Sequence, residues 1–345
     1  MGCLLYGSHM VLAWSPNGVA RRGVSGHRIT IPIQALGLET MTRQRISIAC
    51  CINEAYALPL AVMLTSLTER LRPAFEATVY LTHQHLSQKT LDAVNAIGDT
   101  RAVQLAGACL DRLPRNRTFP PEASAPLLLP DVLPEDLGKV LFLDADLLIL
   151  DDISPLWMQT LEGCSLAAVV DPAIPYCRSP RGVKDWQARG IPRSSHYLNA
   201  GVLLIDLEAW RRRDVAGRAL EYLRAVGNRV DYLHQEAINA TVWNDWLPVA
   251  TRWNLSANAG RWFDPIDGDA VASPAIVHFA GRVKPWRMES GSRFAGAYAE
   301  VLSRVTSRIP RPARAWRDRA LGWYDRGLRG ACYPAERFLW TRRVL

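Results

Sequence analysis

Short apolar runs of strand length recur along the chain, and stretches with helical spacing separate several of them. Runs without polar positions are typical of strands covered on both faces, as in parallel α/β sheets. The intervening stretches place apolar residues three and four positions apart, as amphipathic helices do. The expected strands are Ile46–Ile52, Ala77–Leu81, Ala102–Leu105, Val140–Leu143, Leu166–Val170, Val202–Ile205 and Ala275–Phe279. The expected helices are Leu58–Leu71, Ser87–Ile97, Leu207–Arg213 and one that opens at His234.

The first part of this pattern has the order strand, helix, strand, helix, strand, which is that of a nucleotide-binding half of an α/β fold. Ser87 fits the N-cap of the second helix, because its hydroxyl can accept a backbone hydrogen bond there. The chain contains no G-x-G-x-x-G and no P-loop motif, so neither a dinucleotide-binding fold nor a P-loop NTPase is indicated. We therefore predict one α/β domain with a mixed, mostly parallel central sheet.

The two ends of the chain differ from this central part. Residues 1–40 mix Gly, Ser, Arg and short apolar pieces without a period, and they lack the ordered zones of a signal peptide. We expect this segment to be a poorly ordered extension. The main domain is expected at residues 41–310, and residues 311–345 form a basic, aromatic tail with helix-like spacing.

Composition narrows the class of protein. With 345 residues, 49% of them apolar and 21% charged, the chain is long enough to fold around a sizeable core. No apolar run approaches the roughly 20 residues needed to cross a bilayer. The seven cysteines are scattered without a C-x-x-C pair, which argues for reduced thiols in the cytoplasm and against a zinc site.

The formal net charge is +8 and comes mainly from arginine, which suits phosphate-bearing partners or an anionic membrane surface. In residues 311–345 arginines are interleaved with Trp, Tyr and Phe, as in a helix that lies in a membrane interface. A surface helix packed on the domain is the alternative. Nucleic acid is not expected as a partner, because no nucleic-acid-binding motif supports it. We expect a cytoplasmic protein, with this tail as a peripheral anchor on the inner face of the cell membrane.

The segment Lys139–Asp152, KVLFLDADLLILDD, carries the strongest candidate chemistry. Its apolar strand ends at Asp144-Ala145-Asp146, and open α/β sheets bind ligands beyond the carboxyl ends of their strands. Two ionised carboxylates at the end of a buried strand are costly without a partner, and a divalent cation is the usual partner. The alternative is that Asp144 and Asp146 are ordinary turn or cap residues.

A second candidate group surrounds the last expected strand. His278 adds an imidazole to the two carboxylates, and this set suits Mn²⁺ or a similar first-row ion. Gly281 lets the backbone approach a ligand closely, and Lys284 supplies positive charge for a departing diphosphate. Asn199 and Gln235 are uncharged residues suited to binding sugar hydroxyls, although each could equally be a turn or cap residue.

The chain resembles glycosyltransferase family 8 in four blocks that occur in the family's order: LFLDADLLIL, YLNAGVLLIDLEAW, HQEAIN and VHFAGRVKPW. That family includes the bacterial lipopolysaccharide α-galactosyltransferases and glycogenin. The resemblance spans roughly Ile46–Trp286 and implies a single-domain, Rossmann-like fold of the glycosyltransferase A type, with residues 41–310 as the catalytic domain. Bacterial members carry a basic, aromatic C-terminal tail thought to hold them on the inner membrane, and residues 311–345 are similar, which implies a helical appendage.

The resemblance implies a reaction and a metal site. The family transfers a hexose from a nucleotide sugar to a hydroxyl of a saccharide or glycolipid, with retention of anomeric configuration, and its bacterial members act in cell-surface polysaccharide synthesis. Asp144, Asp146 and His278 match the ligands of a Mn²⁺ ion, for which Mg²⁺ is the alternative. Gly281 and Lys284 match contacts to the diphosphate of a UDP-hexose donor.

The resemblance also implies roles for residues around the donor. Asn199 and Gln235 match contacts to the donor sugar and are the candidate catalytic residues. Ala49 and Asn53 fall where the family holds the nucleoside. Asp171 matches a position near the acceptor.

Three positions depart from the family's pattern. Cys51 stands where the first strand usually ends in an aspartate that pairs with uracil. Leu127 stands where an arginine usually lies on the helix before the metal strand. His234 stands where many bacterial members have an aspartate beside the glutamine. The first two positions bear on the base and on donor orientation and the third bears on the sugar, whereas none of them touches the metal set.

The sequence places no Asp or Glu as a covalent nucleophile, so same-face attack by an acceptor hydroxyl is the favoured mechanism. A double displacement through a covalent intermediate is the alternative. Two other classes of function compete with sugar transfer. A nucleotidyltransferase or metal-dependent phosphohydrolase could use the same aspartates and a lysine, and a decayed glycosyltransferase could bind nucleotide sugars without catalysis. Retention of all three metal ligands argues against decay.

Overall fold

The structure is a computed structural model that describes strands within residues 13–32 and then residues 43–105, 107–113, 121–258, 269–281, 284–287, 290–306 and 309. The chain divides into two compact units, Met1–Gln44 and Arg45–Leu345. The first unit contains an antiparallel sheet of β1 (Ala13–Trp14), β2 (Val19–Val24) and β3 (His27–Pro32). These strands were not predicted, because residues 1–40 show no regular spacing of apolar residues.

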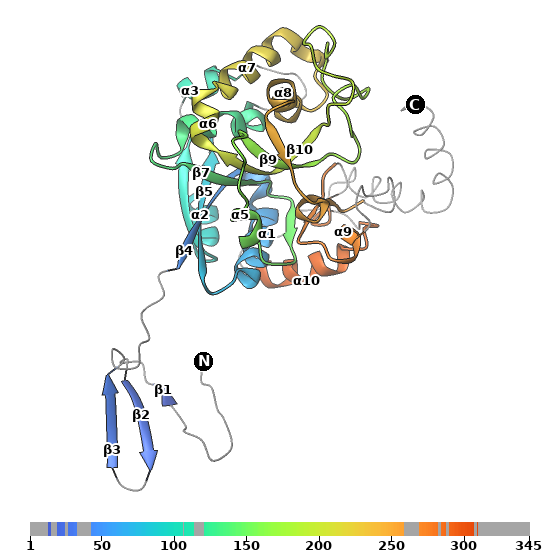
Figure 1. The fold of residues 1–345 in the computed structure, drawn as a ribbon. Coiled ribbons are helices and arrows are strands. Elements are labelled where there is room, and N and C mark those ends of the chain that lie inside the picture. The colour runs from blue at the N-terminus through green and yellow to red at the C-terminus, as the bar shows by residue number, and fades with distance from the viewer. Residues whose placement is uncertain are drawn as a thin grey trace. The chain divides into compact units, whose positions relative to one another are not determined.

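A seven-stranded mixed sheet forms the centre of the second unit, in the order β11-β9-β10-β7-β4-β5-β6 (Figure 1). Its strands are β4 (Gln44–Cys51), β5 (Phe75–His83), β6 (Asp99–Gln104), β7 (Lys139–Leu143), β9 (Leu166–Val170), β10 (Leu198–Asp206) and β11 (Trp246–Pro248). β4 is parallel to β7, β5 to β6 and β11 to β9, whereas β10 runs antiparallel to β7 and β9. The predicted mixed, mostly parallel sheet is confirmed.

Helices cover both faces of this sheet (Figure 1). The longer ones are α1 (Ala57–Arg70), α2 (Gln88–Asn95), α6 (Leu207–Arg212), α7 (Val215–Val226), α8 (Leu233–Val242) and α10 (Ala295–Val305). Short ones are α3 (Gly107–Asp111), α4 (Leu129–Val132), α5 (Ser154–Trp157) and α9 (Asp269–Ala272). The 3₁₀ turns are η2 (Glu54–Tyr56), η3 (Pro121–Leu128), η4 (Gly227–Arg229) and η5 (Thr251–Asn254). Ser87 accepts a hydrogen bond from the Thr90 backbone N–H, as its predicted capping role requires.

Alternate side chains of the central strands face two separate cores, because successive residues of a strand point to opposite faces. Phe142 packs in one core with side chains of η3, α7 and α8. Its neighbours Leu141 and Leu143 pack in the other core with the apolar face of α1. The stretch Val140–Leu143 of β7 is therefore buried on both faces, which explains why it has no polar position.

A second, three-stranded sheet consists of β8 (Leu147–Ile149), β12 (Leu255–Ser256) and β13 (Ile276–His278), in the order β12-β13-β8. The chain leaves β7, turns at Asp144-Ala145-Asp146 and enters β8 directly. The acidic turn therefore lies where the two sheets meet. The sequence did not predict that the apolar run after this turn is a strand of a different sheet. The expected strand Ala275–Phe279 belongs to this second sheet, as β13.

No helix among the described residues is both long and apolar enough to cross a membrane. The tail at residues 311–345, with its predicted helix, lies outside the described part of the chain.

Asn239 connects α8 to β10 by hydrogen bonds in the protein interior. It is fully buried, and its Oδ1 accepts a hydrogen bond from the Leu198 N–H at 2.7 Å. Its Nδ2 donates to the carbonyls of Leu198 and Gln235, both at 2.9 Å. This side chain thus holds the first turn of α8, which carries Gln235, against the start of β10, which carries Asn199.

We expect Asn239→Ala to lower the free energy of unfolding by about 2–4 kcal/mol, because it leaves two buried backbone groups of Leu198 without partners at roughly 1–3 kcal/mol each. Urea unfolding followed by circular dichroism measures the loss. Asn228, which is exposed on η4, is the matched control, and Asn228→Ala should stay within about 0.5 kcal/mol of wild type. Equal unfolding midpoints for the two variants would contradict this role of Asn239.

Candidate active site

The turn after β7 is fixed by backbone hydrogen bonds from both sheets. The Asp144 N–H donates to the Gly201 carbonyl of β10 at 2.9 Å. The Phe279 N–H, directly after β13, donates to the Asp146 carbonyl at 3.0 Å. The antiparallel register of β8 and β13 places His278 opposite Leu147. Two segments more than a hundred residues apart in sequence are thereby held side by side.

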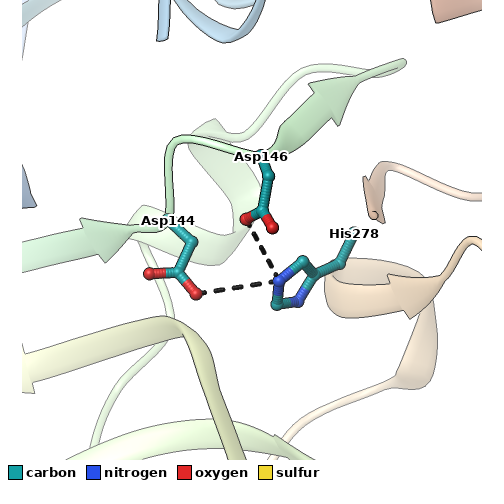
Figure 2. A group of neighbouring side chains, drawn as sticks. All are labelled: Asp144, Asp146 and His278. Atoms are coloured by element: carbon teal, nitrogen blue, oxygen red, sulfur yellow. Dashed lines mark ion pairs between the residues drawn. The ribbon is translucent and has the colours of Figure 1, made fainter. Parts of the chain in front are cut away.

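His278 completes a cluster with the two carboxylates, and Figure 2 shows both of them directed at the same ring nitrogen. Its Nε2 lies 3.3 Å from Asp146 Oδ1 and 3.7 Å from Asp144 Oδ2. One ligand atom from each residue lies within 4.8 Å of the others. Asp146 and His278 are buried, and Asp144 is partly exposed. The structure thus brings the three predicted metal ligands together.

This donor set fits a divalent cation. Carboxylate oxygens with one imidazole nitrogen suit Mn²⁺ and related ions. The cluster is accessible from the side of Asp144, which is partly exposed. The two carboxylates also lie close together beside His278, and Asp146 is buried, so two uncompensated charges there would be costly. Burial and the Asp146 carboxylate both raise the pKa of Asp144 above its usual range.

Lys284 compensates Asp146 within the protein itself. Its Nζ donates to Asp146 Oδ2 at 2.5 Å and to the Phe279 carbonyl at 2.9 Å. Burial alone would raise the pKa of Asp146, but the charges of Lys284 and His278 outweigh it and lower that pKa. Burial likewise works against the charged forms of His278 and Lys284, yet Asp146 raises the pKa of both. Protons held by His278 and Asp144 would therefore compete with a cation as the pH falls.

A second polar group centres on Asp171, directly after β9. Its Oδ2 accepts hydrogen bonds from Asn199 Nδ2 at 2.9 Å and from Gln235 Nε2 at 3.1 Å. Gln235 Oε1 in turn accepts from the Ala200 N–H at 3.0 Å. The register of β10 against β9 shifts between Asn199 and Leu203, and such bulges often redirect side chains at functional sites. Asn199, Gln235 and Asp171 are therefore brought together as one unit.

An open cavity of about 320 Å³ joins the two polar groups. The predicted site residues that line it are Asp144, Asp146, Asp171, Asn199, Gln235, His278 and Gly281. Gly281 has a φ of 90°, in the left-handed region that favours glycine. Lys284 reaches the cluster through Asp146.

The two residues predicted to hold the nucleoside do not line this cavity. Ala49 is buried in the core on β4. Asn53 accepts a hydrogen bond from the Ala55 N–H and so caps η2. Their role in holding the nucleoside stays a prediction.

The positions that depart from the family's pattern have clear environments. Cys51 is partly buried at the end of β4, and its Sγ lies 2.8 Å from Thr82 Oγ1. Burial raises the pKa of Cys51 to about 12, so the thiol is neutral. Leu127 is fully buried in the core with α7 and α8, and His234 is partly buried on α8.

Sequence reasoning missed several residues of the cavity. Tyr232, Asn254, Ser256 and Asn258 also line it. Asn254 is buried and bonds to both His278 and Asn199. No local pattern indicates it, because β12 is only two residues long and its pairing with β13 joins distant parts of the chain.

Comparison with known proteins identifies a family and several relatives of the chain. The model of a family described as glycosyl transferase family 8 matches residues 47–290. General stress protein A of Bacillus subtilis is 27% identical over 51% of this chain and 62% of its own length. Lipopolysaccharide 1,3-galactosyltransferase of Salmonella typhimurium is 24% identical over 51% of this chain and 52% of its own length. The chain thus matches between half and two thirds of these relatives' lengths.

A solved structure has the same architecture. An active-site mutant of LgtC superposes with a TM-score of 0.63 and 26% identity, over 75% of this chain and 96% of that chain. This similarity confirms the predicted glycosyltransferase A-type fold. Because the family model covers well over half of the sequence and includes all four blocks quoted above, the chain belongs to glycosyl transferase family 8.

Proposed function

We propose that the chain is a retaining, metal-dependent glycosyltransferase that moves a hexose from UDP to a hydroxyl of a saccharide or glycolipid. The observation that carries this proposal is the cluster of Asp144, Asp146 and His278 in the wall of a cavity that Asn199 and Gln235 also line. The Salmonella relative, a lipopolysaccharide 1,3-galactosyltransferase, supports a role in cell-surface polysaccharide synthesis. The catalytic domain would span residues 41–310.

The residues around the cluster suit a departing diphosphate. A divalent cation held by Asp144, Asp146 and His278 supplies positive charge where the leaving group becomes more negative. Lys284 adds a second positive charge beside the cluster. Gly281 presents backbone without a side chain at the cavity wall, so phosphate oxygens can approach it closely.

The surroundings of Asp171 favour same-face attack over double displacement. Its Oδ1 accepts from the N–H groups of Ala173 and Ile174, and its Oδ2 accepts from Asn199 and Gln235. Four donors occupy the roughly four lone-pair sites of a carboxylate, which makes Asp171 a weak nucleophile. Its role is to orient the two amides, which hold the donor sugar while an acceptor hydroxyl attacks on the face that the diphosphate leaves.

The tail at residues 311–345 supports a further part of the proposal. Its arginine and tryptophan content suits the anionic inner face of a membrane. A glycolipid acceptor resides in such a membrane, so a tethered enzyme would meet it at high local concentration. The catalytic domain would then work from the cytoplasmic side.

The central test is a panel of nucleotide sugars incubated with Mn²⁺, with release of nucleoside diphosphate and transfer to an acceptor measured separately. We expect activity with a UDP-hexose and an α-linked product by NMR, and we expect it to disappear in EDTA. Asp146→Asn should cut turnover by orders of magnitude, because the charge stabilisation by a metal contributes several kcal/mol. Release of pyrophosphate or inorganic phosphate without sugar transfer would instead indicate a nucleotidyltransferase or a phosphohydrolase.

Asp151 provides the matched control for this test. It lies in the same acidic segment, but it is exposed and pairs with Arg252 on the surface at 2.7 Å. Asp151→Asn should therefore retain nearly full turnover. Full activity of Asp146→Asn, or of wild type in EDTA, would refute the metal assignment.

Lys284→Met should change the binding of metal and nucleotide in opposite directions. Without nucleotide, the Lys284 ammonium occupies an oxygen of Asp146 that a cation needs, so its removal should tighten Mn²⁺ binding at least about tenfold. With Mn²⁺ present, UDP should bind about tenfold more weakly, because the diphosphate loses a positive partner. Calorimetric titration measures both affinities. Lys139→Met, which removes a cation at the other end of β7, should change neither affinity. If Lys284→Met instead weakened the binding of both Mn²⁺ and UDP, the prediction would be wrong.

Cys51 should make recognition of the base weak. Its neutral thiol cannot provide the charge-assisted hydrogen bond of an aspartate, which is worth roughly 1.5–3 kcal/mol. We expect wild type to prefer UDP only weakly over CDP, GDP and TDP in Mn²⁺, and Cys51→Asp to tighten UDP alone about ten- to a hundredfold. Cys51→Ser, which adds no charge, should gain less than about tenfold. A strong preference of wild type for UDP that Cys51→Asp leaves unchanged would exclude this position as the determinant.

A further inference from the structure

Asn254 connects the metal cluster with the amide group around Asp171. It lies at the end of η5, directly before β12, and only 3% of its surface is exposed. Its Oδ1 lies 3.0 Å from His278 Nδ1, and its Nδ2 donates to Asn199 Oδ1 at 2.9 Å. A continuous chain of hydrogen bonds therefore runs from His278 through Asn254 and Asn199 to Asp171.

A backbone group determines the direction of every bond in this chain. The Gly201 N–H, which can only donate, lies 3.0 Å from Asn199 Oδ1, so that atom must be the carbonyl oxygen. Asn199 then turns its Nδ2 toward Asp171, and Asn254 must offer its own Nδ2 to Asn199. The oxygen of Asn254 is left for His278. Nδ1 of His278 must therefore carry a proton, which leaves Nε2 as the atom for a cation.

Gly201 also makes room for this arrangement. A Cβ at Gly201 would lie 2.3 Å from His278 Cε1 and 2.6 Å from His278 Nδ1. A side chain there would push the imidazole away from Asn254 and from the carboxylates. The residue that donates this N–H to Asn199 must therefore be a glycine.

We propose that Asn254 is a positioning residue that sets the tautomer and orientation of His278 and joins the metal site to the sugar-binding amides. This inference rests on the proposed metal-dependent transfer. A second partner on the non-coordinating nitrogen generally fixes a metal-binding histidine, and its loss typically costs 10–100-fold in metal affinity or activity. Because Asn254 bonds in two directions, its two functions can be separated by substitution.

The experiment compares Asn254→Leu with Asn254→Asp. Mn²⁺ alone is titrated into each protein, with free Mn²⁺ measured by electron paramagnetic resonance. Asn254→Leu loses the acceptor for Nδ1–H and should bind Mn²⁺ about 10–100-fold more weakly. Asn254→Asp keeps an acceptor and should bind Mn²⁺ at least as tightly as wild type. This arm needs no substrate, so it stands even if the proposed transfer fails.

The second measurement is turnover of the UDP-hexose at saturating Mn²⁺. A carboxylate at position 254 cannot donate to Asn199 Oδ1, so the two acceptors repel and the Asn199 amide is displaced. Asn254→Asp should therefore lose at least about tenfold in turnover while retaining Mn²⁺ affinity. A purely structural residue would lower both quantities together.

Asn258 lines the same cavity but, within the described part of the chain, forms no hydrogen bond with His278. Asn258→Leu controls for lost polarity and should bind Mn²⁺ like wild type, and Asn258→Asp controls for an added charge. Folding is verified by thermal unfolding. Mn²⁺ affinity of folded Asn254→Leu within about threefold of wild type would overturn the proposal. If Asn254→Leu fails to fold, Asn254→Asp decides alone. A tenfold loss of its Mn²⁺ affinity, or a loss of turnover no larger than that of Asn258→Asp, overturns the proposal.

Discussion

The site depends on the electrostatic compensation of Asp146, a buried carboxylate at the junction of two sheets. Removing such an ion from water costs several kcal/mol, which only close cationic partners can offset. Lys284 and His278 provide that compensation from segments more than a hundred residues later in the chain. The acidic turn is therefore stable only because β13 pairs with β8 and brings His278 and Lys284 close to Asp146. The same pairing also forms the binding site.

The parts of the fold that the sequence predicted are those with a local pattern. Val140–Leu143 is buried on both faces and therefore wholly apolar, and the helical spacing of Leu58–Leu71 reflects one face against the core. The strand Leu147–Ile149 was missed because it is only three residues long and follows β7 after a turn of three residues, although it belongs to another sheet. Asn254 was missed because its contacts join distant segments, which leave no period along the chain.

The candidate residues behave as one connected system. Asp171, Asn199, Gln235, Asn254 and His278 form a single hydrogen-bonded network. Each amide in it has one possible orientation, since a backbone N–H fixes Asn199 and another fixes Gln235. Effects of substitutions in such a network are not additive, because loss of one member frees its neighbours to rotate. The resemblance to the family identified several members one by one, whereas only the structure connects them.

The charged side chains of the site are concentrated around the metal cluster. Asp144, Asp146, His278 and Lys284 surround the proposed diphosphate position, while Cys51 is neutral and Leu127 is buried in the core. Contacts to a diphosphate are the same for every nucleoside diphosphate, so they favour no particular base. Amides with fixed donor and acceptor directions, in contrast, penalise a sugar that leaves one of them buried and unpaired. Selectivity for the donor would therefore lie mainly in the hexose, at Asn199 and Gln235, and much less in the nucleotide.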